Sequence, residues 1–221
     1  IANEGDMDGG SRGFTVFRKD GTEVFESGLS FEYAVAEIGH YPEERSGNKG
    51  VEPEGMEFGV FGGTPMLFLL SERGSVVGVY DMTDPAAPEL TQLLPSGIGP
   101  EGALAIPERN LFVVANEEDL IEDGGVRAHV MIFELGEGEP AYPQLTSAGL
   151  NEDGMPVGWG AVSGMVAGEG DTVWFVNDSF YGMQPSIFEV DTSQTPARIT
   201  DVIGITREGA PAQLMDLEGI T

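Results

Sequence analysis

The chain lacks cysteine, which excludes disulfide bonds, thiolate metal sites and cysteine nucleophiles. It has only two histidines, and because we expect His40 in a loop and His129 inside a strand, a Ser-His-Asp triad is not expected. The phosphate-binding loop, the dinucleotide-binding glycine pattern and the nucleophile elbow are also missing. The candidates that remain are sites built from carboxylates.

Long apolar runs are absent as well. No stretch of 18 apolar residues occurs, so the sequence predicts no membrane-spanning helix. Residues 1–6 are not a basic start followed by an apolar stretch, so we expect no intact signal peptide, and a leader removed earlier stays an open alternative.

Basic residues are scarce. The chain has 10 Lys and Arg against 38 Asp and Glu, which gives a formal charge of −28. Phosphate binding needs clustered basic side chains, so nucleic acid and anionic membranes are expected to be poor partners. The acidic excess has two explanations, a solvated surface that favours solubility at high salt, or cation sites.

Glycine and proline are plentiful, with 33 and 14 residues, and 40% of the chain is apolar, a composition typical of many short strands joined by turns. The sequence also repeats a short phrase. It reads Glu-Pro-Glu-Gly at 52–55, Gly-Pro-Glu-Gly at 99–102 and Asp-Leu-Glu-Gly at 216–219, with a degenerate copy at 161–165. The period is on the order of 50 residues, near that of one four-stranded propeller blade.

We therefore predict an all-β fold, a β-propeller of four-stranded antiparallel blades in one domain, residues 1–221. About four blades are visible, and the chain is either a whole propeller or a piece of a larger one. The predicted blades cover residues 1–50 completed by a last strand at 214–221, then 51–97, 98–158 and 159–213. Closing the ring in this way would remove exposed sheet edges. A short helix is expected at 31–38 and a polar loop at 42–49.

The strands follow from apolar runs between turn residues. They are expected at 13–17 and 22–26; at 56–61, 66–71, 76–82 and 89–94; at 103–106, 111–115, 128–135 and 142–146; and at 163–167, 172–177, 186–190 and 198–203.

Acidic residues recur at two places in each repeat. In a meander, the start of the first strand and the end of the second lie on the same face of the blade, so acids at these places should converge beside the central channel. Two carboxylates ~6 Å apart repel by roughly 3 kcal/mol at an effective dielectric of ~20, so a ring of them needs a cation, an arginine or raised pKa values. Oxygen ligands with so little histidine favour calcium, with magnesium less favoured, over zinc.

The predicted metal ligands include one outlying loop. Asp6-Met7-Asp8-Gly9-Gly10 has the alternating aspartates of a calcium loop without its later bidentate glutamate. The full predicted ligand set is Glu4, Asp6, Glu54, Glu72, Glu101, Glu117, Asp178 and Glu218. The alternative is that each Glu only accepts backbone N–H bonds at a tight blade entrance.

Several phrases together resemble a known family. Ala2-Asn3-Glu4-Gly5-Asp6, the run Asn-Lys-Gly-Val-Glu-Pro-Glu-Gly at 48–55 and Val-Tyr-Asp-Met-Thr-Asp-Pro at 79–85 look like the bacterial extracellular choice-of-anchor I family, over about the first 135 residues. Residues 215–220 are similar to the opening of the esterase-like phytase domain. One departure is that only residues 7–12 stand where family members usually carry a long insertion.

The resemblance implies a secreted, periplasmic or cell-surface propeller of the kind often labelled alkaline phosphatase or phytase-like. In the enzyme hypothesis, calcium and Arg73 hold a small phosphorylated substrate while Glu54, Glu101 or Glu117 positions the attacking water. In the alternative, the chain is a non-catalytic surface module that meets a protein partner and holds calcium for rigidity. Arg73 would then be a salt-bridge partner of a neighbouring glutamate.

Overall fold

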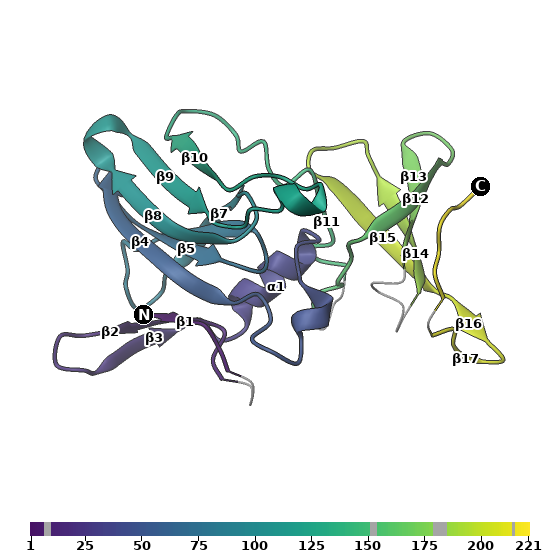
Figure 1. The fold of residues 1–221 in the computed structure, drawn as a ribbon, viewed down its shortest axis with the longest axis horizontal. Coiled ribbons are helices and arrows are strands. Elements are labelled where there is room, and N and C mark those ends of the chain that lie inside the picture. The colour runs from purple at the N-terminus through teal and green to yellow at the C-terminus, as the bar shows by residue number, and fades with distance from the viewer. Residues whose placement is uncertain (7–9, 151–153, 179–184, 214) are drawn as a thin grey trace. The chain divides into compact units, whose positions relative to one another are not determined.

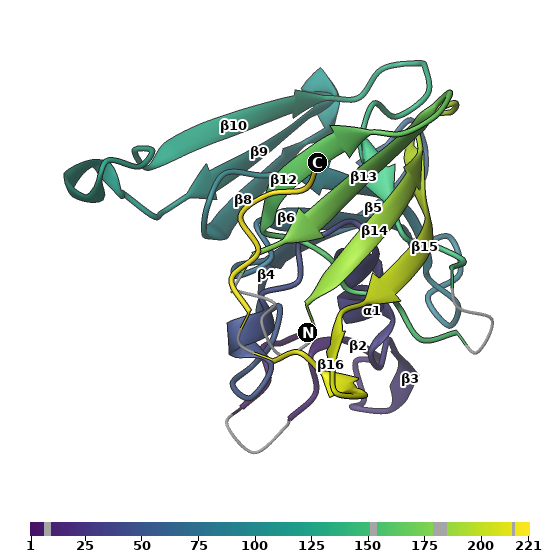
Figure 2. The ribbon, with the colours of Figure 1, turned by 90° about the vertical axis from the view of Figure 1, so that its right-hand side faces the viewer.

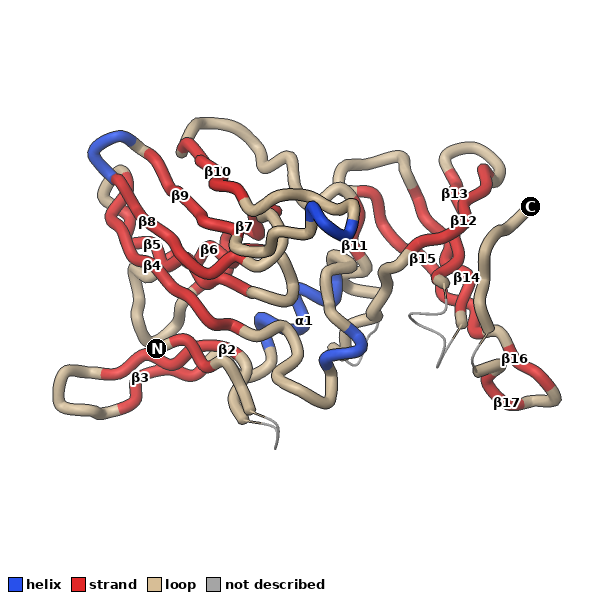
Figure 3. The backbone as a smooth tube through the Cα atoms, in the orientation of Figure 1, coloured by secondary structure: helices blue, strands red, loops and turns tan. Residues whose placement is uncertain are grey.

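The computed structural model describes residues 1–6, 10–150, 154–178, 185–213 and 215–221 (Figure 1). These residues form mainly antiparallel β-sheets, and the one α-helix among them is α1 (Ser30–Glu37), close to the predicted span (Figure 3). The chain divides into two compact units. The first unit comprises Ile1–Glu32 and Arg45–Tyr142, and the second comprises Tyr33–Glu44 and Pro143–Thr221.

The first unit contains three antiparallel sheets. One is formed by β1 (Ala2–Asn3), β2 (Gly13–Phe17) and β3 (Glu23–Glu26); the next by β4 (Pro53–Phe61), β5 (Thr64–Ser71), β6 (Val76–Asp81) and β7 (Glu89–Pro95); and the third by β8 (Pro100–Ile106), β9 (Leu111–Asn116) and β10 (His129–Glu134). The four-stranded meander β4–β7 confirms the strands predicted between 56 and 94. Short 3₁₀ turns occur at η1 (Glu43–Arg45), η2 (Pro107–Arg109) and η3 (Ile121–Asp123).

One core cluster of the first unit lies between the sheets β4–β7 and β8–β10. Phe68 of β5 stacks on Phe112 of β9 with ring centroids 3.9 Å apart, and Phe61 meets Phe68 edge-on. All three rings are buried. Aromatic pairs of this kind add about 0.5–1.5 kcal/mol beyond their area burial. Because side chains alternate between the two faces of a strand, these rings all lie on the faces that the two sheets turn toward each other.

The strand predicted at 142–146 is wrong. Residues 142–146, expected as the fourth strand beside β10, instead yield β11 (Leu145–Thr146), which pairs in parallel with β15 (Ala197–Gly204) of the second unit. The reason is the intervening run Gly136-Glu137-Gly138-Glu139-Pro140, in which glycine weakens a strand and proline cannot donate to a ladder. The third sheet therefore ends at β10 with three strands.

The second unit contains one larger sheet, ordered β11-β15-β14-β13-β12. Figure 2 shows β12, β13, β14 and β15 side by side. The other strands of this sheet are β12 (Val162–Ala167), β13 (Thr172–Asn177) and β14 (Ser186–Asp191), all as predicted, and a small hairpin joins β16 (Thr206–Arg207) to β17 (Ala210–Pro211). Phe175 and Phe188 stack at 4.6 Å in its core.

The C-terminal segment departs from the predicted strand. Among the described residues, 215–221 contain no strand. They lie beside the start of β12, where the Ser163 hydroxyl donates a hydrogen bond to the Leu217 carbonyl. The pairing of this segment with the N-terminal strands stays a prediction.

Two glycines of the repeat phrases give a matched test of how tightly the sheets approach. A Cβ added at Gly55 in β4 would lie 2.5 Å from the backbone carbonyl oxygen of Glu101 in β8, whereas one at Gly102 would meet its nearest atom, in Ala115, at 3.5 Å. We expect Gly55→Ala to lower the free energy of unfolding by about 1–3 kcal/mol through overpacking and Gly102→Ala to be nearly neutral. Urea melts of the two variants would measure this, and equal stabilities would contradict the close approach.

Candidate metal centre

The repeat phrase folds as a β-bulge in each of its first three copies. The strand register shifts between Pro53 and Gly55 in β4, between Pro100 and Gly102 in β8, and between Val162 and Gly164 in β12. A bulge leaves one residue outside the regular pairing and re-aims its side chain. The residues in that position are Glu54, Glu101 and Ser163.

A second feature of the repeat places another acid beside each bulge. The residue before each bulged strand has a left-handed backbone, with φ of 53° at Glu52, 66° at Gly99 and 45° at Ala161. Its carbonyl accepts a hydrogen bond from the residue after the next strand. These N–H donors are Glu72, Glu117 and Asp178, at 3.0, 2.9 and 3.0 Å. The chain therefore brings the end of each second strand to the bulge of the first.

In the first unit these positions gather into one acidic cluster. Oxygens of Glu54, Glu72 and Glu101 lie within 4.8 Å of one another, and the same holds for Glu72 with Glu117 and Glu118. Glu72 is 4% exposed, while Glu54, Glu101 and Glu117 face solvent. The cluster thus joins a buried carboxylate to exposed ones that leave room for water ligands.

In a neighbouring group, carboxylate oxygens of Glu4, Glu52 and Glu54 also lie within 4.8 Å of one another. This group already contacts basic side chains. The Lys49 ammonium contacts both Glu4 and Glu52, and Glu52 also meets Arg45 at 2.6 Å and Arg73 at 3.2 Å. Burial opposes ionisation of Glu52, which is 3% exposed, but the hydrogen bonds from Arg45 and Lys49 prevail and lower its pKa. These basic groups occupy the place of a metal ion here.

Arg73 forms ion pairs with three carboxylates. Its Nε lies 3.2 Å from Glu52, its Nη2 2.6 Å from Glu72 and its Nη1 3.2 Å from Glu118. Burial alone would lower the pKa of the guanidinium, but these carboxylates raise it. The predicted salt-bridge role is therefore the one that the structure describes.

In the acidic cluster, Arg73 supplies too little positive charge to neutralise all of the carboxylates. Burial and then a contact with Glu54 raise the pKa of Glu72 to about 8, although Arg73 acts in the opposite sense. Burial, followed by the charges of Glu117 and Glu54, raises the pKa of Glu101. Without a bound cation, close carboxylates hold protons instead; with one, they are ligands.

The predicted ligands divide into three groups. Glu54, Glu72, Glu101 and Glu117 come together in the acidic cluster, and Glu4 lies in the neighbouring group that Lys49 neutralises. Asp6 accepts a hydrogen bond from the Gly10 N–H at 2.9 Å, and residues 7–9 of that predicted loop lie outside the described residues. Asp178 and Glu218 belong to the second unit, and their part in a metal site stays a prediction.

Sequence reasoning missed Glu52 and Glu118. Glu52 stands inside the most specific phrase of the chain, but its importance comes from its contacts with Arg45 and with Arg73, and Arg73 is 21 residues away in sequence. Glu118 carries no signal in the repeat, and its role comes from its contact with Arg73 and its place beside Glu72 and Glu117.

The raised pKa of Glu72 predicts how stability depends on pH in a metal chelator. Between the ordinary glutamate value of 4.5 and the folded value of about 8, the native state binds more protons than the unfolded state. The free energy of unfolding should therefore fall as pH rises through this window. Glu72→Gln should flatten the slope in melts from pH 5 to pH 8, and a slope that the variant leaves unchanged would contradict the assignment.

Comparison with known proteins supports the family resemblance for the N-terminal part of the chain. Residues 4–85 match the family model of the Choice-of-anchor I domain. No curated protein matches the chain. Among solved structures, the hydrazine synthase of Kuenenia stuttgartiensis aligns at 15% identity with a TM-score of 0.22, over 63% of this chain and 46% of that chain. This chain thus spans less than half of that protein's length. Of the helices in the described residues, none has the length and apolar character needed to cross a membrane.

Proposed function

We propose that the acidic cluster of the first unit binds a divalent cation, calcium in preference to magnesium, and that the chain is a surface module in which this cation has a structural role. The observation that carries the proposal is the convergence of Glu54, Glu72 and Glu101 around a region that Arg73 only partly neutralises. Calcium accepts six to eight oxygens in irregular geometry, whereas magnesium requires near-octahedral ligands and dehydrates reluctantly. A cluster in which Glu54 and Glu101 face solvent beside the buried Glu72 suits calcium.

Phosphoester hydrolysis of the alkaline phosphatase or phytase type is the second candidate. The exposed Glu101 and Glu117 favour it, because they leave positions where a metal-bound water could sit. Against it stands Arg73, the one basic group proposed to hold phosphate, whose three nitrogens already face Glu52, Glu72 and Glu118. A phosphate would have to displace charge-assisted contacts. The non-catalytic module is therefore the better-supported function.

We further propose that the sheets are blades of a propeller. In three of the sheets, one strand carries a bulged copy of the repeat phrase: β4, β8 and β12. This supports the propeller, as does the face-to-face packing of β4–β7 on β8–β10 through Phe68 and Phe112. The match to the Choice-of-anchor I domain supports an extracellular or cell-surface location. A surface protein is the partner that this location favours.

Two assays test the proposed function. Native mass spectrometry of metal-stripped protein, offered equal calcium and magnesium, should show calcium adducts in preference to magnesium. Hydrolysis of p-nitrophenyl phosphate and of phytate by the calcium-loaded protein should stay at the uncatalysed rate. Turnover that Glu101→Gln abolishes and Glu122→Gln preserves would establish the hydrolase instead, and equal retention of both metals would remove the calcium preference.

A further inference from the structure

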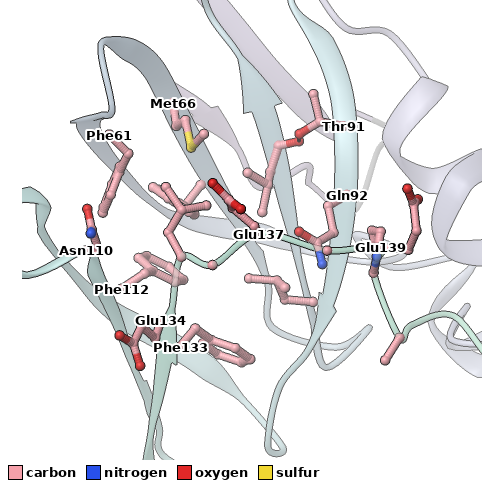
Figure 4. A pocket seen from close by; sticks show the side chains of 18 residues that line it. Phe61, Met66, Thr91, Gln92, Asn110, Phe112, Phe133, Glu134, Glu137 and Glu139 are labelled. Atoms are coloured by element: carbon pink, nitrogen blue, oxygen red, sulfur yellow. Dashed lines mark hydrogen bonds between the residues drawn. The ribbon is translucent and has the colours of Figure 1, made fainter.

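A cavity of about 400 Å³ lies between the sheets β4–β7 and β8–β10 of the first unit (Figure 4). Phe61 and Met66 line it from one sheet, and Phe112 and Phe133 line it from the other. The volume is in the range of ligand pockets, which are mainly apolar with a few polar groups at the rim. It is therefore large enough to take one or two apolar side chains.

The cavity lies where the third sheet has no fourth strand. Gln92 and Leu94 of β7, the fourth strand of the neighbouring sheet, line it, and within the described residues no strand pairs with the outer edge of β10 (Figure 2). The segment that follows β10 contributes Glu137 and Glu139 to the lining without pairing as a strand. The space beside β7 is left partly empty for this reason.

Along the outer edge of β10, backbone N–H and C=O groups have no partner strand among the described residues. The Leu135 N–H donates to the Asn110 carbonyl, which continues the β9–β10 register. In an antiparallel pair, residues alternate between facing the partner strand and facing away. The N–H and C=O groups of Val130, Ile132 and Glu134 therefore face outward, and the side chains of Val130 and Ile132 are 61% and 66% exposed.

The charge at the rim indicates the occupant. Glu134, Glu137 and Glu139 all line the cavity, and within its described lining there is no lysine or arginine. A second copy of this chain, at a formal charge of −28, would be repelled. A segment that carries positive charge would be attracted, and its apolar side chains could enter the cavity that Phe112 and Phe133 line.

We propose that the edge of β10 and the adjacent cavity bind an extended basic peptide segment of a partner protein. The segment adds as a strand beside β10, places alternate apolar side chains in the cavity and sets lysine or arginine against the acidic rim. This is strand addition, in which backbone hydrogen bonds give affinity and pockets for alternate side chains give specificity. The proposal needs no metal ion, so its test runs in chelator and can fail independently of the calcium proposal.

The test uses three labelled seven-residue peptides and the whole chain. One peptide alternates lysine with phenylalanine or valine, the second replaces lysine by glutamate, and the third is the lysine peptide N-methylated at alternate backbone amides. Fluorescence anisotropy should show binding of the first only, with about a tenfold or greater loss for the third because its strand hydrogen bonds are removed. Hydrogen exchange should slow at the amides of Val130, Ile132 and Glu134 when the first peptide binds.

Two sets of variants test the backbone edge of β10 and the acidic rim of the cavity independently. Ile132→Pro removes an N–H that faces away from β9, a position where edge strands tolerate proline, and should abolish binding while circular dichroism stays native. Glu137→Lys with Glu139→Lys should weaken binding, whereas the same charge change at Glu122 and Asp123 in η3 should have much less effect.

Three results would overturn the proposal. Lack of binding at millimolar peptide would do so directly. Equal binding of the N-methylated peptide, without protection of β10, would show that the cavity takes an apolar group with no added strand. Dimers in sedimentation experiments, with protection at β10 in the absence of peptide, would make a second copy the occupant.

Discussion

Calcium should raise the melting temperature of the metal-stripped protein by several degrees. The folded state brings Glu54, Glu72, Glu101 and Glu117 together, and their repulsion is offset when a cation binds among them. Calcium at ~100 times its dissociation constant, bound only to the native state, adds about 2.7 kcal/mol to the free energy of unfolding. In a domain of this size that is a shift of roughly 5–10 °C, which differential scanning calorimetry measures directly.

The control for this melt is ionic strength. Magnesium chloride at the same ionic strength should shift the melting temperature less, because magnesium fits irregular carboxylate groups poorly. Glu101→Gln should reduce the calcium effect, and Glu122→Gln, in the exposed turn η3, should leave it in place. Coincident melts in chelator and calcium would identify the acids as a salt-adapted surface without a metal site.

Glu52→Gln should lower the free energy of unfolding by about 1.5–3 kcal/mol. Glu52 is 3% exposed and its carboxylate faces Arg45, Lys49 and Arg73, so the substitution leaves three basic groups around a neutral amide. Removing the buried carboxylate is costly because Arg45 loses its ion pair, although Lys49 still contacts Glu4 and Arg73 still contacts Glu72 and Glu118. Glutamine keeps the size and the backbone hydrogen bond to the Glu72 N–H, so chemical denaturation of this variant in chelator isolates the charge.

A matched exposed pair provides the comparison. Asp119 and Arg127 lie 3.3 Å apart with side chains 40% and 68% exposed. Surface pairs contribute about 0–1 kcal/mol, so Asp119→Asn should be nearly neutral. If Glu52→Gln were equally mild, the three basic groups around Glu52 would not form the buried ionic centre described above.

The strands were predictable because their signals are local. Alternating apolar residues between glycine and proline turns gave β4–β7 and β12–β15 within a few residues, and the spacing of Phe31, Val35 and Ile38 gave α1. The strand predicted at 142–146 was assigned to the wrong sheet. The pairing partner of a short strand that follows a glycine- and proline-containing segment depends on which sheet edge it reaches. Its pairing with β15 is a long-range contact that local pattern does not encode.

The site was partly predictable for the same reason. Repetition of the phrase marked Glu54 and Glu101, and strand ends marked Glu72 and Glu117. The bulges and the left-handed residues Glu52 and Ala161 were not visible, since neither is a glycine. Arg73, which contacts both groups of carboxylates, reaches Glu52 from 21 residues away, and spacing alone cannot predict that contact.

The most direct test of the central claim is isothermal titration of calcium into the metal-stripped protein. A saturable exothermic or endothermic transition should appear, weakened about tenfold or more in Glu54→Gln and in Glu101→Gln through loss of a ligand charge, and unchanged in Glu122→Gln. Equal calcium affinity in all four proteins, or no saturable binding in any, would contradict a metal centre at the acidic cluster.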